Sequence, residues 1–135
     1  NPAERDVKEL PGMLEYIHKN GLKVKQTPAG VYYAITEKGK GKLPKEGHTM
    51  MIHYTGKLLD GTKFDSSYDR NEPIEVPLGA NRVIMGWESG LPYFNKGSKG
   101  VLVIPSSMGY GEKGSSPLVP ANASLVFEIE VVDVK

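Results

Sequence analysis

Two segments in which apolar and polar side chains alternate place the strongest constraint on how this chain can fold. Between Leu125 and Val131 the odd-numbered residues are apolar, whereas Glu128 and Glu130 stand between them. The segment 48–59 has the same pattern, with apolar side chains at positions 50, 52 and 54. Because successive side chains of a strand point to opposite faces, both segments predict strands with one buried and one solvated face.

Three shorter apolar segments, each bounded by Gly, Pro or Asp clusters, complete an antiparallel sheet. They span residues 31–37, 73–78 and 99–105. Before the last of them, Val83, Ile84 and Trp87 recur at helical spacing, which predicts a short helix across the dry face of the sheet. The expected fold class is therefore α+β, with one short helix packed on one antiparallel sheet.

The N-terminal segment predicts a separate amphipathic helix. Its apolar residues recur at spacings of three and four, which is typical of one stripe along a helix. They are Val7, Leu10, Leu14 and Ile17. Since a proline inside a helix removes a hydrogen bond, we expect Pro11 to stand at a helix start or at a kink. The preferred prediction is a helix over residues 11–20 that starts at Pro11 and ends before Gly21. We expect its apolar stripe to pack on the domain or on a second copy of the chain.

Composition and charge exclude several classes of function. A chain of 135 residues can bury one proper core, and its 16 glycines and 10 prolines indicate many turns. Lys and Glu are interspersed and the net charge is +1, so we expect no nucleic-acid partner and no anionic membrane partner. We also expect no membrane-spanning segment, because no apolar run approaches about 18 residues.

The residue types needed for covalent or metal chemistry are missing or badly placed. The chain has no cysteine, which excludes thiol nucleophiles and Cys-ligated zinc. His48 and His53 would face opposite sides of one strand, and His18 lies in the N-terminal helix, so no metal site is expected. No serine stands in a Gly-x-Ser-x-Gly elbow. We therefore expect neither a metal site nor covalent catalysis.

The segment KFDSSYDR, residues 63–70, combines an aromatic ring with two carboxylates and a guanidinium. Phe64 and Asp65 are neighbours, so they can face one site only if the strand bends between them. The alternative is a polar connection after a turn, with one buried ring and solvated charges. Taken alone, these eight residues favour the polar connection.

A longer series of motifs resembles the FKBP-type prolyl isomerases. In chain order these motifs are YTG, DG, FDSS, LG, VIMGW, YG and LVF, and their spacing is similar to that of the family. The resemblance runs from about Gly30 to the end of the chain. It implies an isomerase domain at residues 30–135, built as a half-wrapped antiparallel sheet around a short helix. Residues 1–29 would be a helical extension and linker.

The resemblance also implies an apolar pocket between sheet and helix that accepts a proline ring. Trp87 would form its floor, while the Ile84 N–H and the Tyr110 hydroxyl would hold carbonyl groups of the substrate. Asp65 would lie at the rim beside the twisting carbonyl, where hydrogen bonds from Arg70 and Tyr54 would keep it charged. The implied catalytic residues are Tyr54, Phe64, Asp65, Ile84 and Tyr110. The implied substrate-binding residues are Arg70, Ile74, Val83, Trp87, Ser115, Val119 and Phe127.

Two positions depart from the usual family pattern. Ile74 stands where an aromatic wall is usual, and Ser115 stands where a histidine often occurs. These changes imply a different pocket shape, a shifted preference for the residue before proline, and weaker macrolide binding.

The resemblance implies a peptidyl-prolyl cis-trans isomerase that uses no metal or organic cofactor and assists folding of proline-containing polypeptides. It also implies inhibition by macrolides of the tacrolimus and rapamycin type. The alternative is a binding module of the same fold that serves as a chaperone or adaptor with little turnover.

Removing the residues before Gly30 is expected to leave activity on small peptides nearly intact. A helical extension of this kind resembles bacterial envelope members, which favours the periplasm or an envelope anchor over the cytoplasm. The oligomeric state and the client proteins stay open.

Overall fold

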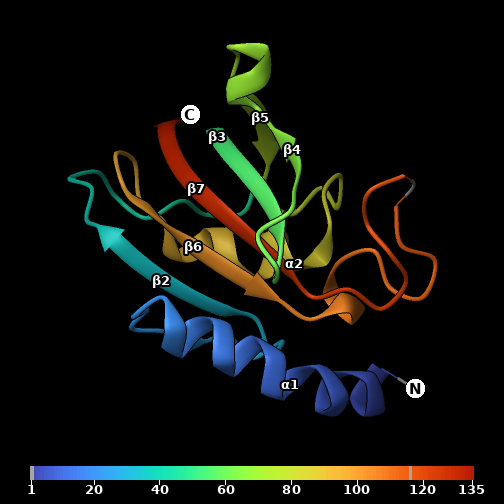
Figure 1. Ribbon diagram of the computed structural model, residues 1–135. Coiled ribbons are helices and arrows are strands. Elements are labelled where there is room, and N and C mark those ends of the chain that lie inside the picture. The colour runs from blue at the N-terminus through green and yellow to red at the C-terminus, as the bar shows by residue number, and fades with distance from the viewer. Residues whose placement is uncertain (1, 116) are drawn as a thin grey trace.

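The computed structural model describes residues 2–115 and 117–135, which form one antiparallel sheet with helices on both of its faces (Figure 1). The helices are α1 (Pro2–Lys19) and α2 (Met85–Gly90), with 3₁₀ turns η1 (Tyr68–Arg70), η2 (Leu91–Tyr93) and η3 (Ser106–Met108). The strands are β1 (Lys25–Gln26), β2 (Tyr32–Glu37), β3 (Thr49–Leu58), β4 (Lys63–Ser66), β5 (Ile74–Pro77), β6 (Lys99–Ile104) and β7 (Leu125–Val134). The strand order is β1-β2-β6-β7-β3-β4, and β5 pairs with β3.

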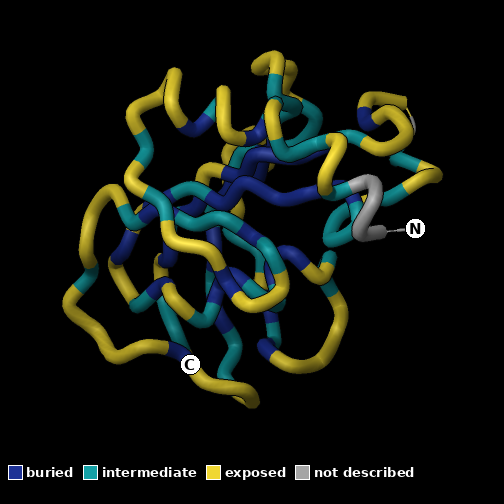
Figure 2. Tube along the Cα trace, turned by 90° about the horizontal axis from the view of Figure 1, so that it is seen from below, coloured by how far each residue is buried: buried dark blue, intermediate teal, exposed yellow. Residues whose placement is uncertain are grey.

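The main core lies between the concave face of the sheet and α2. The odd-numbered side chains of β7 and the even-numbered side chains of β3 point into it, as their alternation predicts. Figure 2 shows this burial concentrated along the central strands, with exposed loops around them. The α+β class and the short helix around Trp87 are therefore confirmed.

Gly56 of β3 has no side chain, which leaves room for two aromatic rings of the main core. Gly56 is paired with Phe127, and a Cβ at this position would lie 2.7 Å from the Phe64 ring and 2.9 Å from the Phe127 ring. The pairing of β3 with β4 shifts register between Gly56 and Lys57. This irregularity provides the bend that the segment 63–70 needs to bring Phe64 and Asp65 toward the same region. Both β1 and β4 lack an apolar alternation, and the sequence does not predict them.

Helix α1 is longer than the sequence predicts, because it continues through Pro11 to Pro2. A proline inside a helix costs about 3 kcal/mol, so contacts elsewhere must hold the preceding turns. Asp6 and Glu9, which lie on those turns, accept hydrogen bonds from the loop after β6. The prediction of a helix start at Pro11 was wrong because these long-range contacts outweigh the local cost.

The buried stripe of α1 also differs from the predicted one. Met13 and Ile17 are buried and Leu10 is partly buried, whereas Val7 and Leu14 are 70% and 45% exposed. Residues 10, 13 and 17 follow one another at spacings of three and four, so the helix presents a stripe rotated from the predicted one.

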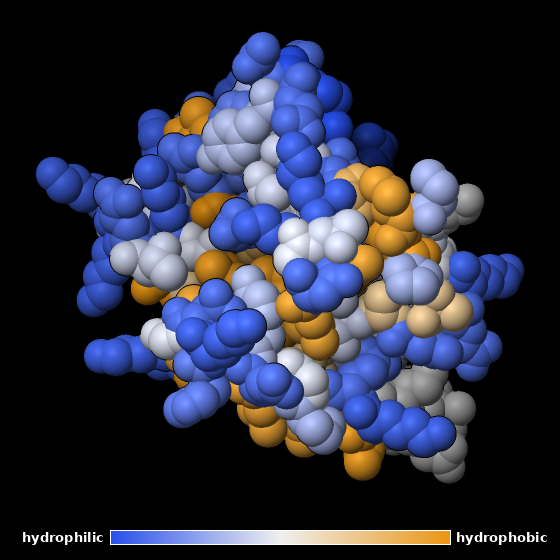
Figure 3. Space-filling model, viewed as in Figure 1, coloured by the Kyte–Doolittle hydropathy of each residue, from blue (hydrophilic) through white to orange (hydrophobic). Residues whose placement is uncertain are grey.

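Figure 3 shows that the apolar surface on one side of the molecule is divided into patches separated by hydrophilic side chains.

Helix α1 packs on the outer face of the sheet. Met13 and Ile17 contact a second core whose sheet residues are Val103 of β6 and Val126 of β7. The outer face is therefore solvated around Glu128 but covered where α1 crosses it. Within the described residues, no helix has the length and apolar character needed to cross a membrane.

Candidate functional site

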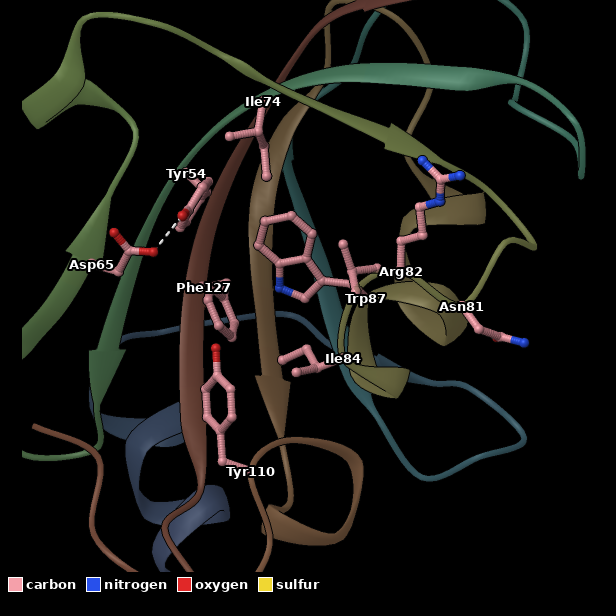
Figure 4. A pocket seen from close by; sticks show the side chains of 10 residues that line it. Tyr54, Asp65, Ile74, Asn81, Arg82, Ile84, Trp87, Tyr110 and Phe127 are labelled. Atoms are coloured by element: carbon pink, nitrogen blue, oxygen red, sulfur yellow. Dashed lines mark hydrogen bonds between the residues drawn. The ribbon is translucent and has the colours of Figure 1, made fainter. Parts of the chain in front are cut away.

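A cavity of about 440 Å³ opens between the concave face of the sheet and the start of α2 (Figure 4). Its lining comes from β3, β4, β5 and β7, from the residues around α2, and from the loop between β6 and β7. The lining residues are Tyr54, Asp65, Ile74, Asn81, Arg82, Val83, Ile84, Trp87, Tyr110 and Phe127. The cavity is apolar at its base and carries charged groups at its rim.

Aromatic rings in edge-to-face contact form the base of the cavity. Trp87 is 3% exposed, and its ring lies 5.2 Å from the ring of Phe127 at 88° and 5.0 Å from that of Tyr54 at 81°. Phe64 extends this cluster, since its ring meets Phe127 at 5.6 Å and Tyr110 at 6.4 Å. The indole N–H of Trp87 is buried and has no hydrogen-bond partner within the described residues. These contacts fix a flat apolar surface that a small ring can cover.

A network of three side chains fixes a negative charge at the rim. The Tyr54 hydroxyl donates to Asp65, and Arg70 donates to Asp65 over 2.8 Å and to the Tyr54 hydroxyl over 2.9 Å. Both bonds to Asp65 that the sequence predicts are therefore present. Partial burial raises the pKa of Asp65, but the hydrogen bonds from Tyr54 and Arg70 outweigh it and hold the pKa below its ordinary value of 3.8. Asp65 is thus a carboxylate at neutral pH, locked in orientation.

The residues that precede α2 supply the opposite wall. The carboxylate of Glu88 accepts hydrogen bonds from the backbone N–H groups of Gly79 at 2.8 Å and Asn81 at 2.9 Å, which fixes the loop before the helix. Ile84 is the N-cap of α2, and its carbonyl accepts from the N–H of Trp87. Since the N–H of an N-cap residue has no place in the helical hydrogen-bond series, this donor can serve a ligand.

Tyr110 reaches the cavity from the loop between β6 and β7. Its side chain points toward Phe127 and Ile84 (Figure 4), and the residue is 37% exposed. Burial of its hydroxyl, with a smaller effect of the Asp65 charge, raises the pKa of Tyr110 above 10.0. The phenol is therefore protonated at neutral pH and can donate a hydrogen bond.

Eight of the twelve site residues expected from the sequence line the cavity. Phe64 packs behind Phe127, and Arg70 acts through Asp65 and Tyr54. Ser115 and Val119 are absent from the lining and form a backbone bridge with each other, with Val119 in the core. The roles of all twelve residues stay predictions.

Asn81 and Arg82 line the cavity, although the sequence reasoning missed them. Asn81 adopts a left-handed backbone conformation with φ of 55°, which turns the chain just before the helix. They lie between the LG and VIMGW motifs, directly before Val83, and this position is the signal that could have found them. Among the described residues, no group of acidic, His or Cys side chains could hold a metal ion.

Comparison with known proteins identifies the family. The model of the FKBP-type peptidyl-prolyl cis-trans isomerase family matches residues 40–132. The chain belongs to this family. The resemblance read from the motifs is therefore confirmed, and the chain carries an FKBP-type isomerase domain.

Relatives of this FKBP-type domain occur in fungi and bacteria. The chain is 46% identical over 106 residues to FK506-binding protein 1A of Aspergillus fumigatus, which covers 78% of this chain and 95% of that protein. It is 40% identical over 133 residues to the isomerase FkpA of Escherichia coli K12, which covers 98% of this chain but 47% of that protein. The chain thus spans about half the length of the FkpA relatives that it matches.

Solved structures show the same fold. The crystal structure of FkpA from Escherichia coli matches with a TM-score of 0.80 and 39% identity, covering 99% of this chain and 62% of that one. A peptidyl-prolyl cis-trans isomerase from Pseudomonas syringae matches with a TM-score of 0.82 and 32% identity, covering 100% of this chain and 96% of that one. The FKBP-like architecture expected from the motifs is therefore confirmed.

Proposed function

We propose that this cavity binds the proline ring of an X-Pro peptide and accelerates rotation about the X-Pro bond, so that the chain assists the folding of proline-containing polypeptides. The observation that carries the proposal is the pairing of a Trp87 floor with a fixed Asp65 carboxylate at the rim. In this assignment residues 30–135 are the catalytic domain, and residues 1–29 are an extension attached to it.

The chemistry needs no covalent step. Rotation about a peptide bond costs about 18–20 kcal/mol because the planar amide is stabilised by resonance, and the twisted amide has lost that resonance together with its charge separation. An apolar surface such as that of Trp87 and Phe127 disfavours the more dipolar planar form relative to the twisted one. Each preference of about 1.4 kcal/mol for the twisted form gives a factor of ten in rate.

Polar groups around the apolar base add selectivity for the twisted form. The Tyr110 hydroxyl and the Ile84 N–H are donors that can hold carbonyl groups of the peptide on either side of the bond. Asp65 is held by Tyr54 and Arg70 before any substrate arrives, so it needs no reorganisation as the carbonyl twists. Proton transfer is not required, which suits a carboxylate whose pKa lies below its ordinary range.

The same cavity is proposed to bind macrolides of the tacrolimus and rapamycin type, whose pipecolinyl ring is similar to proline. A relative that is 46% identical is named an FK506-binding protein. Ile74 provides an aliphatic wall where the family usually has an aromatic one, so we expect weaker affinity than a fully aromatic pocket would give.

Trp87 is the only tryptophan in the chain, so its emission should report occupancy of the cavity. Titration with FK506 is expected to displace water from the indole, change the emission saturably, and inhibit isomerisation competitively. Trp87→Leu should remove the optical signal but keep part of the activity, because the mechanism uses an apolar surface more than an indole. Saturating FK506 with no effect on emission or turnover would show that the cavity is not the proline site.

A further inference from the structure

The loop that carries Tyr110 is tied to the N-terminal helix at both of its ends. This loop, residues 105–124, leaves β6 after Ile104 and returns to the sheet at Leu125, which is paired with Ile104. Its first and last turns therefore lie side by side next to α1. Ser106 and Ser124, which stand at these turns, are both buried.

Glu9 of α1 satisfies the polar groups of both serines. One oxygen of its carboxylate accepts from the Ser106 N–H and from the Ser124 hydroxyl, each at 2.7 Å, and the other accepts from the Ser106 hydroxyl at 2.5 Å. On the preceding turn of the helix, Asp6 accepts from the Ser107 hydroxyl at 2.7 Å. Without Glu9, three donors around these buried serines would lose their acceptor, which is costly for groups away from water.

The hydrogen bonds continue from Ser106 to both neighbours of Tyr110. The carbonyl of Ser106 accepts from the N–H of Gly109 at 3.0 Å and from the N–H of Gly111 at 2.9 Å. The carbonyl of Gly111 in turn accepts from the N–H of Asn122 at 2.8 Å. The backbone on each side of Tyr110 is therefore hydrogen-bonded to the carbonyl of Ser106. Ser106 in turn donates two hydrogen bonds to Glu9.

The helix end of this connection is itself fixed. Met13 and Ile17, one and two turns after Glu9, are 2% and 7% exposed and pack on Val103 and Val126 of the sheet. Glu9 thus projects from an element that is anchored to the same two strands between which the Tyr110 loop runs.

We infer that Glu9 is a positioning residue for Tyr110, and that α1 contributes to the isomerase site through this contact. The inference rests on the proposed role of the Tyr110 hydroxyl. It revises the expectation that residues before Gly30 can be removed without loss of activity on small peptides, since their removal would take away the acceptor that orders the loop.

The test compares Glu9→Ala with Glu15→Ala in the full chain. Glu15 lies on the exposed side of the same helix, so its replacement makes the same change of charge without touching the loop. We expect Glu9→Ala to lower kcat/KM on a short X-Pro peptide about fivefold, which is within the range of coupling inside one hydrogen-bond network, and Glu15→Ala to leave it unchanged. Amide hydrogen exchange at Gly109 and Gly111 should accelerate in Glu9→Ala and stay slow in Glu15→Ala.

Combination with Tyr110→Phe separates positioning of the hydroxyl from loss of stability. If Glu9 acts through that hydroxyl, Glu9→Ala should reduce kcat/KM less than about twofold in the Tyr110→Phe background. An equal loss in both backgrounds, or unchanged exchange at Gly109 and Gly111, would overturn the inference. Glu9→Gln keeps the volume and one carbonyl acceptor, so it serves if Glu9→Ala does not fold, and it should recover part of the activity. Full activity of Tyr110→Phe alone would instead refute the proposed role of the hydroxyl, and with it the inference.

Discussion

Replacing Phe127 with Ala is expected to lower the free energy of unfolding by about 3–5 kcal/mol and to remove most of the isomerase activity. Phe127 is 2% exposed and packs edge-on against both Trp87 and Phe64. Truncation leaves a void in the core and removes one wall of the proline cavity at the same time. Chemical denaturation measures the first effect, and kcat/KM on an X-Pro peptide, per folded molecule, measures the second.

Phe94→Ala is the matched control for Phe127→Ala. Phe94 is fully buried in the same core but does not line the cavity. Its truncation should cost a similar free energy of unfolding and leave the kcat/KM of the folded fraction near that of the unchanged chain. Phe127→Leu, a milder change, can replace Phe127→Ala if the latter does not fold. Equal activity losses at Phe94 and Phe127 would mean that activity follows stability and that the cavity wall has no special role.

Asp65→Leu should lower kcat/KM about tenfold or more with little change in stability. This is the reverse of the result expected for Phe94→Ala. The Asp65 side chain is 41% exposed, and ion pairs this exposed contribute about 0–1 kcal/mol to stability. Its charge, however, is fixed by Tyr54 and Arg70 at the cavity rim, where the carbonyl twists. Thermal melting measured alongside kinetics separates the two effects.

Asp69→Leu controls for removal of a carboxylate from the same segment. Asp69 pairs with Lys63 at 3.0 Å on the exposed surface and does not line the cavity. We expect Asp69→Leu to keep full activity. If unfolding accounts for the whole activity loss of Asp65→Leu, or if both variants lose activity alike, Asp65 has a structural role instead of a catalytic one.

Most of the sheet follows from local pattern. Strands β3 and β7 are long enough for their alternation to be visible, and the helical spacing around Trp87 predicts α2. The sequence does not predict β4, because four residues of mixed polarity carry no pattern and their bend depends on pairing with Gly56. The course of α1 through Pro11 could not be predicted either, since contacts with residues about 100 positions away stabilise it.

The candidate site was predicted mainly through the motif series. Tyr54, Asp65 and Trp87 stand inside those motifs, and the structure brings them to one cavity. Arg82 lies just outside a motif and was missed. Glu9 carries no local signal at all, because its partners become neighbours only when β6 and β7 pair.

The rate of X-Pro rotation in a short peptide, with and without the protein, tests the central claim most directly. The uncatalysed bond rotates over tens to hundreds of seconds, and a protease-coupled assay resolves catalysis against that background. We expect kcat/KM of about 10⁴ M⁻¹ s⁻¹ or more, abolished by saturating FK506. No acceleration at micromolar protein, with FK506 still binding and changing the Trp87 emission, would contradict the claim and show a binding module with little turnover.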